Sequence, residues 1–177
     1  MITVYVPMDS SVLALGADSI AEHITDFAAQ HNIEIQLIRN GSRGMLWLEP
    51  LVEVQTDAGR VGYAAVEPEN LITLLQNGLL NGADLPCSIG LVDEHPYLKN
   101  QSRLTFARLG KTDPLSLADY AAHGGWAGLA AARLLTAQDI VAAVTESGLR
   151  GRGGAAFPAG IKWQTVLNQT ASQKYIV

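Results

Sequence analysis

Residues 2–38 read ITVYVPMDSSVLALGADSIAEHITDFAAQHNIEIQLI, and this stretch decides the fold. Its first five residues alternate and are β-branched, which predicts a strand over 2–6 that Pro7 ends. Apolar residues then recur at helical spacing and predict a helix over 17–31. Apolar and polar residues alternate over 33–38, which predicts a second strand. Two strands joined through a helix are expected to be parallel, with a right-handed crossover.

Two further strands and a helix follow in the next part of the chain. Residues 51–56 and 60–66 predict a hairpin around Asp57-Ala58-Gly59, where Gly59 can supply a positive φ. Pro68 suits the first turn of a helix that continues to Leu80. The order β-α-β-loop-β-β-α predicts an α/β fold close to a thioredoxin-like layer of sheet and helices.

The chain divides into three parts by composition. Residues 1–82 are expected to form the α/β domain, and residues 83–114, rich in Gly, Pro, Asn and Asp, a long connector without a core. Residues 115–177 are Ala- and Gly-rich and predict short helices, at 116–122, 126–134 and 136–147. The chain ends at a strand-like apolar run, residues 173–177, from which we expect a truncated chain.

Composition excludes several classes of protein. Hydrophobic residues make up 48% of the 177 residues, enough for a real core. A net charge of -5 argues against a sequence-independent nucleic-acid binder. Cys87 is the single cysteine and the four histidines are widely spread, so we expect no metal site. We expect no membrane span and no signal peptide, and hence a cytoplasmic protein.

The strongest local signal is the stretch SGLRGRGGAAFPAGIKW, residues 147–163. Its glycines leave backbone N–H groups uncovered, and its two arginines supply charge-assisted donors, so the loop can curl around an anion. Pro158 then begins a helix whose N-terminus points at the same anion, with Lys162 one turn in. From spacing alone, a glycine-rich loop between two helices with surface arginines is an equally good interpretation.

The same stretch closely resembles the flavin loop of the NADH-binding flavoprotein subunit of respiratory complex I and its soluble diaphorase relatives. The resemblance implies flavin mononucleotide (FMN) and NAD as cofactors. It implies that FMN is contacted by Gly151, Arg152, Gly153 and Lys162. It also implies that Phe157 stacks near the nicotinamide or adenine part of NAD. Ala156 stands where many relatives have glycine, and Ala159 where many have threonine.

The first domain resembles a thioredoxin-like [2Fe-2S] ferredoxin module without its cluster. In those modules two cysteines follow the first strand, and two more lie in a loop after the second. Ser42 and Leu46 occupy the second pair of cysteine positions here, and Pro7 and Val12 best match the first pair. None of these side chains can be a thiolate ligand, which excludes a [2Fe-2S] cluster in this domain.

A cluster-free thioredoxin-like domain joined to this flavin loop is similar to the β subunit of soluble NAD-dependent formate dehydrogenases. The resemblance implies electron transfer between NAD(H), FMN and iron–sulfur clusters, with a [4Fe-4S] cluster in a missing C-terminal part. It implies two partners, a molybdenum or tungsten formate dehydrogenase subunit and a thioredoxin-like [2Fe-2S] subunit. Alternatives are the diaphorase subunit of an NAD-linked hydrogenase, the complex I subunit, and a non-catalytic thioredoxin-like interaction module.

The remaining candidates have simpler explanations. Cys87 is expected to be an unreactive connector residue rather than a nucleophile. The apolar run Met45–Trp47 is expected to be a partner contact or packing left after ligand loss. Asp93, Glu94 and His95 are expected to form a solvated loop rather than a metal triad. His123 is expected at a helix end.

Overall fold

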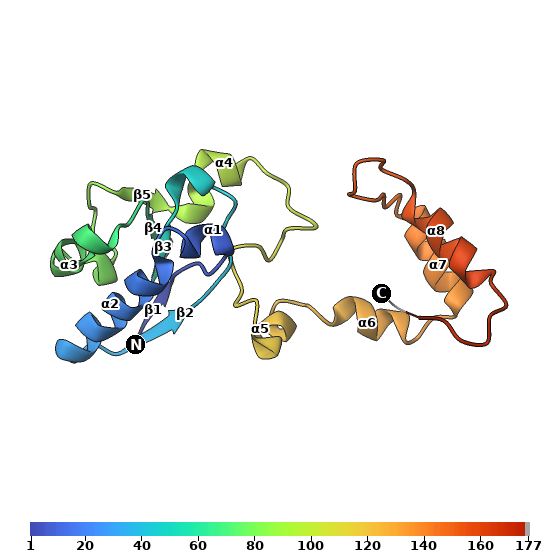
Figure 1. The fold of residues 1–177 in the computed structure, drawn as a ribbon, viewed down its shortest axis with the longest axis horizontal. Helices are drawn as coiled ribbons and strands as arrows, with labels where there is room; N and C mark the ends of the chain where they lie inside the picture. The colour runs from blue at the N-terminus through green and yellow to red at the C-terminus, as the bar shows by residue number, and fades with distance from the viewer. Residues whose placement is uncertain (176–177) are drawn as a thin grey trace. The chain divides into compact units, whose positions relative to one another are not determined.

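The computed structural model describes residues 1–175, which fall into two compact units. The first unit is Met1–His123, and the second begins at Gly124. In Figure 1 the first unit contains all five strands, and the second is helical.

The first unit is built on one five-stranded sheet with the strand order β2-β1-β3-β4-β5. The strands are β1 (Ile2–Tyr5), β2 (Ile35–Ile38), β3 (Val52–Thr56), β4 (Gly59–Tyr63) and β5 (Ser88–Leu91). β1 and β2 are parallel, and every other neighbouring pair is antiparallel. The predicted parallel crossover is therefore present, and the predicted hairpin extends the sheet.

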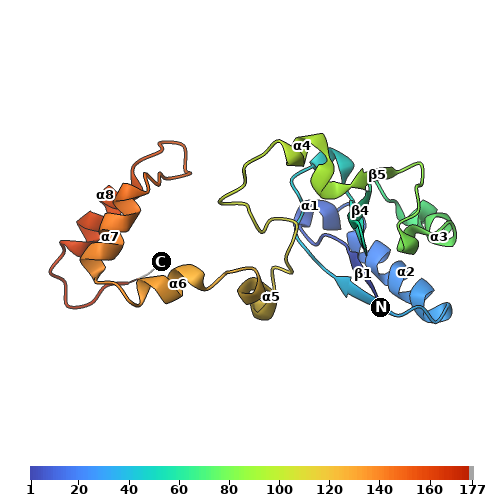
Figure 2. The same cartoon turned by 180° about the vertical axis from the view of Figure 1, so that it is seen from behind.

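Two helices cover one face of this sheet. The helices of the first unit are α1 (Ser10–Leu13), α2 (Ala17–Gln30), α3 (Pro68–Gln76), α4 (Pro96–Lys99) and α5 (Leu117–Ala122). α2 and α3 contact each other, as Figure 2 shows from behind. The core under them joins Ile20 and Ile24 of α2 and Leu71 of α3 to strand residues such as Val4 and Val54, all fully buried.

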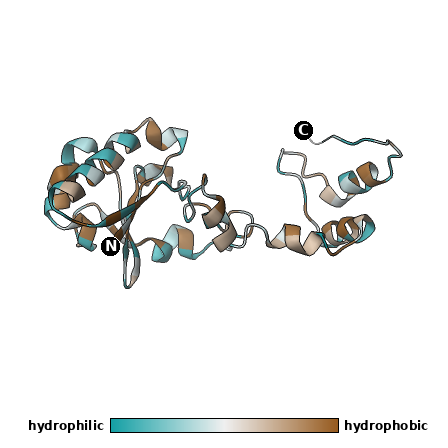
Figure 3. Ribbon diagram, turned by 90° about the horizontal axis from the view of Figure 1, so that it is seen from below, coloured by the Kyte–Doolittle hydropathy of each residue, from teal (hydrophilic) through white to brown (hydrophobic). Residues whose placement is uncertain are grey.

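This architecture confirms the predicted α/β class. A β-α-β unit followed by an antiparallel hairpin and a helix on the same face is a thioredoxin-like arrangement. The strands carry apolar residues at alternate positions because only one face packs against α2 and α3. Apolar residues occur on helices of both units (Figure 3).

The segment predicted as a connector, 83–114, differs from that expectation in its first part. It supplies β5, which pairs with β4, and the buried side chains of Val92 and Leu98. These two residues form a second apolar cluster with Met45 and Leu51. A strand of four residues containing Gly90 has too little alternation to be recognised from sequence, and pairing along β4 stabilises it instead.

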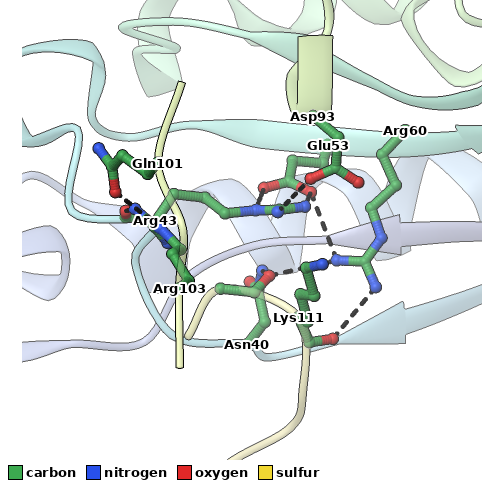
Figure 4. A network of polar contacts seen from close by, with 9 residues as sticks. Asn40, Arg43, Glu53, Arg60, Asp93, Gln101, Arg103 and Lys111 are labelled. Carbon is green, nitrogen blue, oxygen red and sulfur yellow. Dashed lines mark hydrogen bonds and ion pairs between the residues drawn. The ribbon is translucent and has the colours of Figure 1, made fainter. Parts of the chain in front are cut away.

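The face of the sheet opposite α2 and α3 carries a buried ion pair (Figure 4). Arg43 donates to both carboxylate oxygens of Glu53, from Nε at 2.8 Å and Nη2 at 2.7 Å. The two side chains are 2% and 1% exposed. Arg43 Nη1 also donates to Asp93 at 2.9 Å, and Arg60 lies 3.4 Å from Glu53. The pair is thus bidentate and shared with two further charges.

The second unit is a series of three helices, α6 (Ala127–Ala132), α7 (Ala137–Glu146) and α8 (Ala159–Leu167). Thr136 and Asp139 form a capping box that fixes where α7 begins. α7 and α8 pack against each other. The predicted strand-like run at 173–177 shows no strand at residues 173–175, and its last two residues lie outside the described part of the chain.

We predict that Arg43→Met lowers the free energy of unfolding by about 3–5 kcal/mol, because it leaves the Glu53 carboxylate buried without its bidentate partner. Urea denaturation measures this loss. Lys99→Met is the matched control, since Lys99 pairs with Glu94 at the surface and exposed pairs contribute about 0–1 kcal/mol. Equal losses in the two variants would contradict the assigned role of the buried pair.

Candidate functional site

The glycine-rich loop is closed at its base by two backbone hydrogen bonds. The N–H of Gly151 donates to the carbonyl of Phe157 at 2.9 Å, and that of Ala159 donates to Leu149 at 2.8 Å. Arg150 and Pro158 form an isolated antiparallel bridge between these bonds. The chain therefore leaves α7, makes a narrow neck and returns directly into α8, with residues 152–156 at the tip.

Lys162 lies over the neck of this loop. Its ammonium group is 5.8 Å from the centroid of the Phe157 ring, and 4.0 Å from the point where a Cβ on Gly151 would lie. Three of the predicted site residues, Gly151, Phe157 and Lys162, are therefore brought together. Gly153 and the exposed Arg152 lie at the tip, where the Arg152 guanidinium donates to the carbonyl of Arg150 at 2.9 Å.

The backbone at the tip offers several N–H donors to a ligand. Among residues 1–175, the N–H groups of residues 152–156 donate to no protein acceptor. α8 begins at this loop with Pro158 as its N-cap and no side-chain cap. Free N–H groups in a loop and at a helix N-terminus favour a negatively charged ligand. The arrangement can therefore hold an anion beside a lysine.

Ala156 adopts a backbone conformation that L-residues seldom adopt. Its φ is 50°, within the left-handed region, next to Gly154 at 102°. Glycine reaches this region without the steric cost that a Cβ brings. The alanine at this position therefore carries a steric cost that a glycine would avoid. Arg150 holds the turn by donating to the Ala156 carbonyl at 3.1 Å.

Gly160 sets the distance between the two helices that carry the loop. A Cβ at Gly160 would lie 2.2 Å from Oγ1 and 2.7 Å from Cα of Thr145 on α7. The Thr145 hydroxyl donates a hydrogen bond to the carbonyl of Val141 at 2.7 Å, which fixes the side chain in that position. The role of Gly160 is not evident from the sequence alone, since it depends on the packing of α7 and α8.

An apolar hollow of about 350 Å³ lies at the other end of this helix pair. It is lined by Ile140, Val141, Trp163, Val166 and other residues from the start of α7 and the end of α8. Because the loop joins the end of α7 to the start of α8, the hollow and the loop are at opposite ends. The hollow is therefore not part of the anion site.

Three of the four positions that match ferredoxin cysteines are buried, and the fourth is exposed. Pro7 and Val12 are buried, and Leu46 is 61% exposed. Ser42 is buried, and its hydroxyl donates to Glu49 Oε1 at 2.6 Å. Its N–H donates to the carboxylate of Asp9, which ties the loop after β1 to the loop after β2. Within residues 1–175 no group of His, Cys, Asp and Glu has a metal-binding arrangement.

Glu49 is the second buried carboxylate of this domain. Burial raises the pKa of its carboxyl group, although hydrogen bonds from Ser42 and from the N–H of Leu51 oppose the shift. The negative charges of Asp9 and Glu53 raise the pKa further. The folded state therefore binds a proton at Glu49 more tightly than the unfolded chain does.

The other sequence candidates have structural roles. Cys87 packs against the main core, and burial raises the pKa of its thiol, so the less nucleophilic thiol form is favoured. Met45 is fully buried, whereas Leu46 and Trp47 are exposed. His123 is the C-cap of α5, as predicted.

The acidic run 93–95 is divided among three different contacts. Asp93 pairs with Arg43, and Glu94 pairs with Lys99. The ring Nδ1 of His95 accepts from the N–H of Tyr97 at 3.3 Å. The three side chains therefore have separate partners, and in place of the expected solvated loop residues 92–94 form a short 3₁₀ helix, with His95 as the N-cap of α4.

Parts of this chain are similar in sequence to subunits of enzymes that are named for NADH or NADP. Over 79 residues it is 48% identical to the NADP-reducing hydrogenase subunit HndC of Solidesulfovibrio fructosivorans, a match that covers 45% of this chain and 16% of that subunit. Over 58 residues it is 47% identical to an NADH-quinone oxidoreductase subunit of Streptomyces coelicolor, covering 33% and 13%. No protein-family model matches. The chain spans less than a fifth of the length of these relatives.

These similarities confirm the resemblance seen in the sequence: homologues of this chain are subunits of NADH-quinone oxidoreductase and of a NADP-reducing hydrogenase, over part of its length. Among solved structures, a thioredoxin-like [2Fe-2S] ferredoxin from Aquifex aeolicus matches 54% of this chain and 96% of its own. That match has a TM-score of 0.45 and 16% sequence identity. No helix of residues 1–175 meets the length and hydropathy of a membrane span.

We predict that Gly160→Ala lowers the helical content and the melting temperature of the second unit, because the new methyl group overlaps the backbone of Thr145. Circular dichroism on the whole chain measures the change. Gly128→Ala on α6 is the control, since a Cβ there meets nothing within 4 Å and alanine favours a helix. Equal melting temperatures of the two variants would disprove the close contact between α7 and α8.

We predict that Glu49→Gln changes how stability depends on pH. The pKa of Glu49 is higher in the folded state than in the unfolded chain, so folding is most favourable when Glu49 is protonated. The free energy of unfolding of the wild type therefore falls as the pH rises from the ordinary pKa of 4.5 through the raised pKa. Glutamine removes this loss, so the variant gains stability relative to wild type as pH rises through that window. Urea titrations at several pH values test this, and a difference independent of pH would refute it.

Proposed function

We propose that this chain forms the thioredoxin-like domain and the flavin loop of the diaphorase subunit of a cytoplasmic NAD-dependent formate dehydrogenase. In this proposal the cluster-free domain comprises residues 1–82 together with β5 and the buried residues up to Leu98, the rest of 83–114 is the connector, and 115–177 is the start of the FMN- and NADH-binding domain. A [4Fe-4S] cluster would need cysteines beyond those of this chain, which has one.

The observation that carries the proposal is the glycine-rich neck with Lys162 above it. The FMN phosphate carries nearly two negative charges, and burying them requires several donors together with compensating charge. The N–H groups of residues 152–156, the start of α8 and the Lys162 ammonium are all found at this loop. The donor set thus fits a phosphate monoester.

Each site residue then has a distinct task. Gly151 and Gly153 let the backbone approach the phosphate, while Arg152 and Lys162 supply positive charge. Phe157, 45% exposed, offers a flat apolar face to the nicotinamide or adenine part of NAD. The chemistry that FMN supplies when bound is the conversion of hydride transfer from NADH into single-electron steps toward iron–sulfur clusters.

The partners in this proposal are a molybdenum- or tungsten-dependent formate dehydrogenase subunit and a thioredoxin-like [2Fe-2S] subunit. A second candidate is the diaphorase subunit of a hydrogenase, which is favoured by the 48% identity with HndC. Assaying NAD⁺ and NADP⁺ reduction by formate and by hydrogen, with metal analysis of the natively purified protein, separates the two. Formate activity with molybdenum or tungsten supports the first, and hydrogen activity with nickel or iron alone supports the second.

We predict that Lys162→Ala and Arg152→Ala each weaken FMN binding about ten- to a hundredfold, since a charge-assisted hydrogen bond contributes roughly 1.5–3 kcal/mol. Gly153→Val should weaken it more, because its Cβ intrudes where the backbone meets the phosphate. Phe157→Ala should retain FMN and weaken NADH use. Absorbance gives flavin per chain in natively purified protein, and steady-state kinetics give the apparent affinity for NADH.

Lys174→Ala is the matched control for Lys162. Lys174 lies in the same unit, and its ammonium donates to the Val166 carbonyl at 2.7 Å, away from the loop. It should keep full flavin occupancy. If the three loop variants also keep full occupancy after dilution and dialysis, the loop is not the phosphate site.

A further inference from the structure

Charge is distributed unevenly in the first unit. Residues 1–123 contain 15 carboxylates and seven Lys and Arg side chains, yet residues 99–111 hold four of those seven cations and no carboxylate. The four are Lys99, Arg103, Arg108 and Lys111. We call residues 99–111 the basic strap. It is a strongly cationic segment on an otherwise acidic domain.

The basic strap also exposes large apolar side chains. Leu104 is 91% exposed, Phe106 is 62% exposed and Leu109 is 38% exposed. Figures 1 and 2 both show the chain after α4 standing out from the domain before it returns. Cations interleaved with exposed leucine and phenylalanine are typical of a protein-binding surface rather than of a simply solvated loop.

Both ends of the basic strap are fixed by hydrogen bonds to the buried polar network (Figure 4). Arg103 donates to the Arg43 carbonyl at 3.0 Å, and Asn40 donates to the Gly110 carbonyl at 2.8 Å. Arg60 donates to the carbonyls of Gly110 and Lys111 at 3.2 and 3.1 Å. Gly110 packs so closely that a Cβ on it would lie 2.2 Å from Arg43 Cδ. Fixed ends reduce the entropy lost when a partner binds.

A hollow of about 410 Å³ with a mixed polar and apolar lining lies at the base of the basic strap. Its lining includes the side chains of Arg43, Lys99, Arg103 and Lys111, with Asp93 as the single carboxylate. Because Arg43 is paired with Glu53 and Lys99 with Glu94, the positive charge of the hollow comes from Arg103 and Lys111. The hollow is suited to carboxylate side chains of a binding partner.

We propose that the basic strap is a docking surface for an acidic protein surface that contains an apolar depression for Leu104 and Phe106. Because the strap is positively charged, it favours a negatively charged partner surface. Its exposed apolar side chains require that this surface be partly apolar as well. An extended polyanion, a nucleic acid or an anionic membrane, would also face the carboxylates that surround the strap. The proposal concerns the first unit alone and stands whether or not the loop binds FMN.

Defined probes test the proposal on the whole chain. Fluorescent peptides of glutamate alone and of glutamate with leucine are titrated by anisotropy, alongside phosphatidylglycerol vesicles and single-stranded DNA. We expect the glutamate–leucine peptide to bind most tightly, and to weaken as salt is raised. Strap-dependent binding of vesicles or DNA, with none of the peptides, would overturn the proposal in favour of a membrane or nucleic acid.

Variants identify the surface. The double variant Arg108→Glu with Lys111→Glu should weaken peptide binding at least about tenfold. The charge-conserving double variant Arg108→Lys with Lys111→Arg should bind the peptide as tightly as the wild type does. Leu104→Ser with Phe106→Ser should remove the preference for leucine without affecting folding, since both side chains are exposed. Arg133→Glu, in the second unit, is the control and should leave binding unchanged. Equal binding by all variants would overturn the proposal.

Cross-linking then locates the surface on natively purified protein. Of the four lysines in the chain, Lys99 and Lys111 lie in the basic strap, and Lys162 and Lys174 do not. A carbodiimide joins lysine ammonium groups directly to carboxylates. We expect cross-links from Lys99 or Lys111 to Asp or Glu of another protein. Intermolecular cross-links confined to Lys162 and Lys174 would contradict the proposal.

Discussion

The bidentate ion pair between Arg43 and Glu53 organises one whole face of the sheet in the first unit. Its two charges are almost completely buried, so the structure around them must supply partners on every side. Asp93 and Arg60 are such partners, and Arg60 in turn donates to the carbonyls of Gly110 and Lys111, so that the two ends of residues 93–111 are held against the sheet. Hydrogen bonds and the negative charges of Glu53 and Asp93 outweigh burial and raise the pKa of Arg43, which remains charged.

The same face explains what the domain has in place of a ferredoxin cluster. The loops after β1 and β2, where the resembling ferredoxins carry cysteines, are joined here by the bond from Ser42 to Asp9 and the bond from Ser42 to Glu49. These contacts position the loops without a metal. The domain thus has a thioredoxin-like sheet in which three of the positions that match ligand cysteines are buried and the fourth, Leu46, is exposed.

The sequence predicted those features that depend on local pattern. The β-α-β start, the hairpin and the helices near 68–76 and 137–146 follow from periodicity and capping residues. β5 was missed because Ser88–Leu91 is short, contains a glycine and gains its structure from pairing with β4. The Arg43–Glu53 pair was missed because Glu53 occupies an ordinary polar position on an alternating strand. Glycines and arginines mark the loop between α7 and α8, whose anion binding stays a prediction, but the contact of Gly160 with Thr145 depends on how α7 meets α8.

We propose that the loop at residues 150–158 recognises the phosphate of FMN, and a comparison of FMN with riboflavin, which lacks that phosphate, tests this. Amide ¹H–¹⁵N spectra of the 177-residue chain detect even weak binding. We expect FMN to shift the amide signals of residues 151–157 and of the first turn of α8, and riboflavin at the same concentration to leave them in place. Equal shifts with both compounds, or shifts confined to other residues, would contradict the claim.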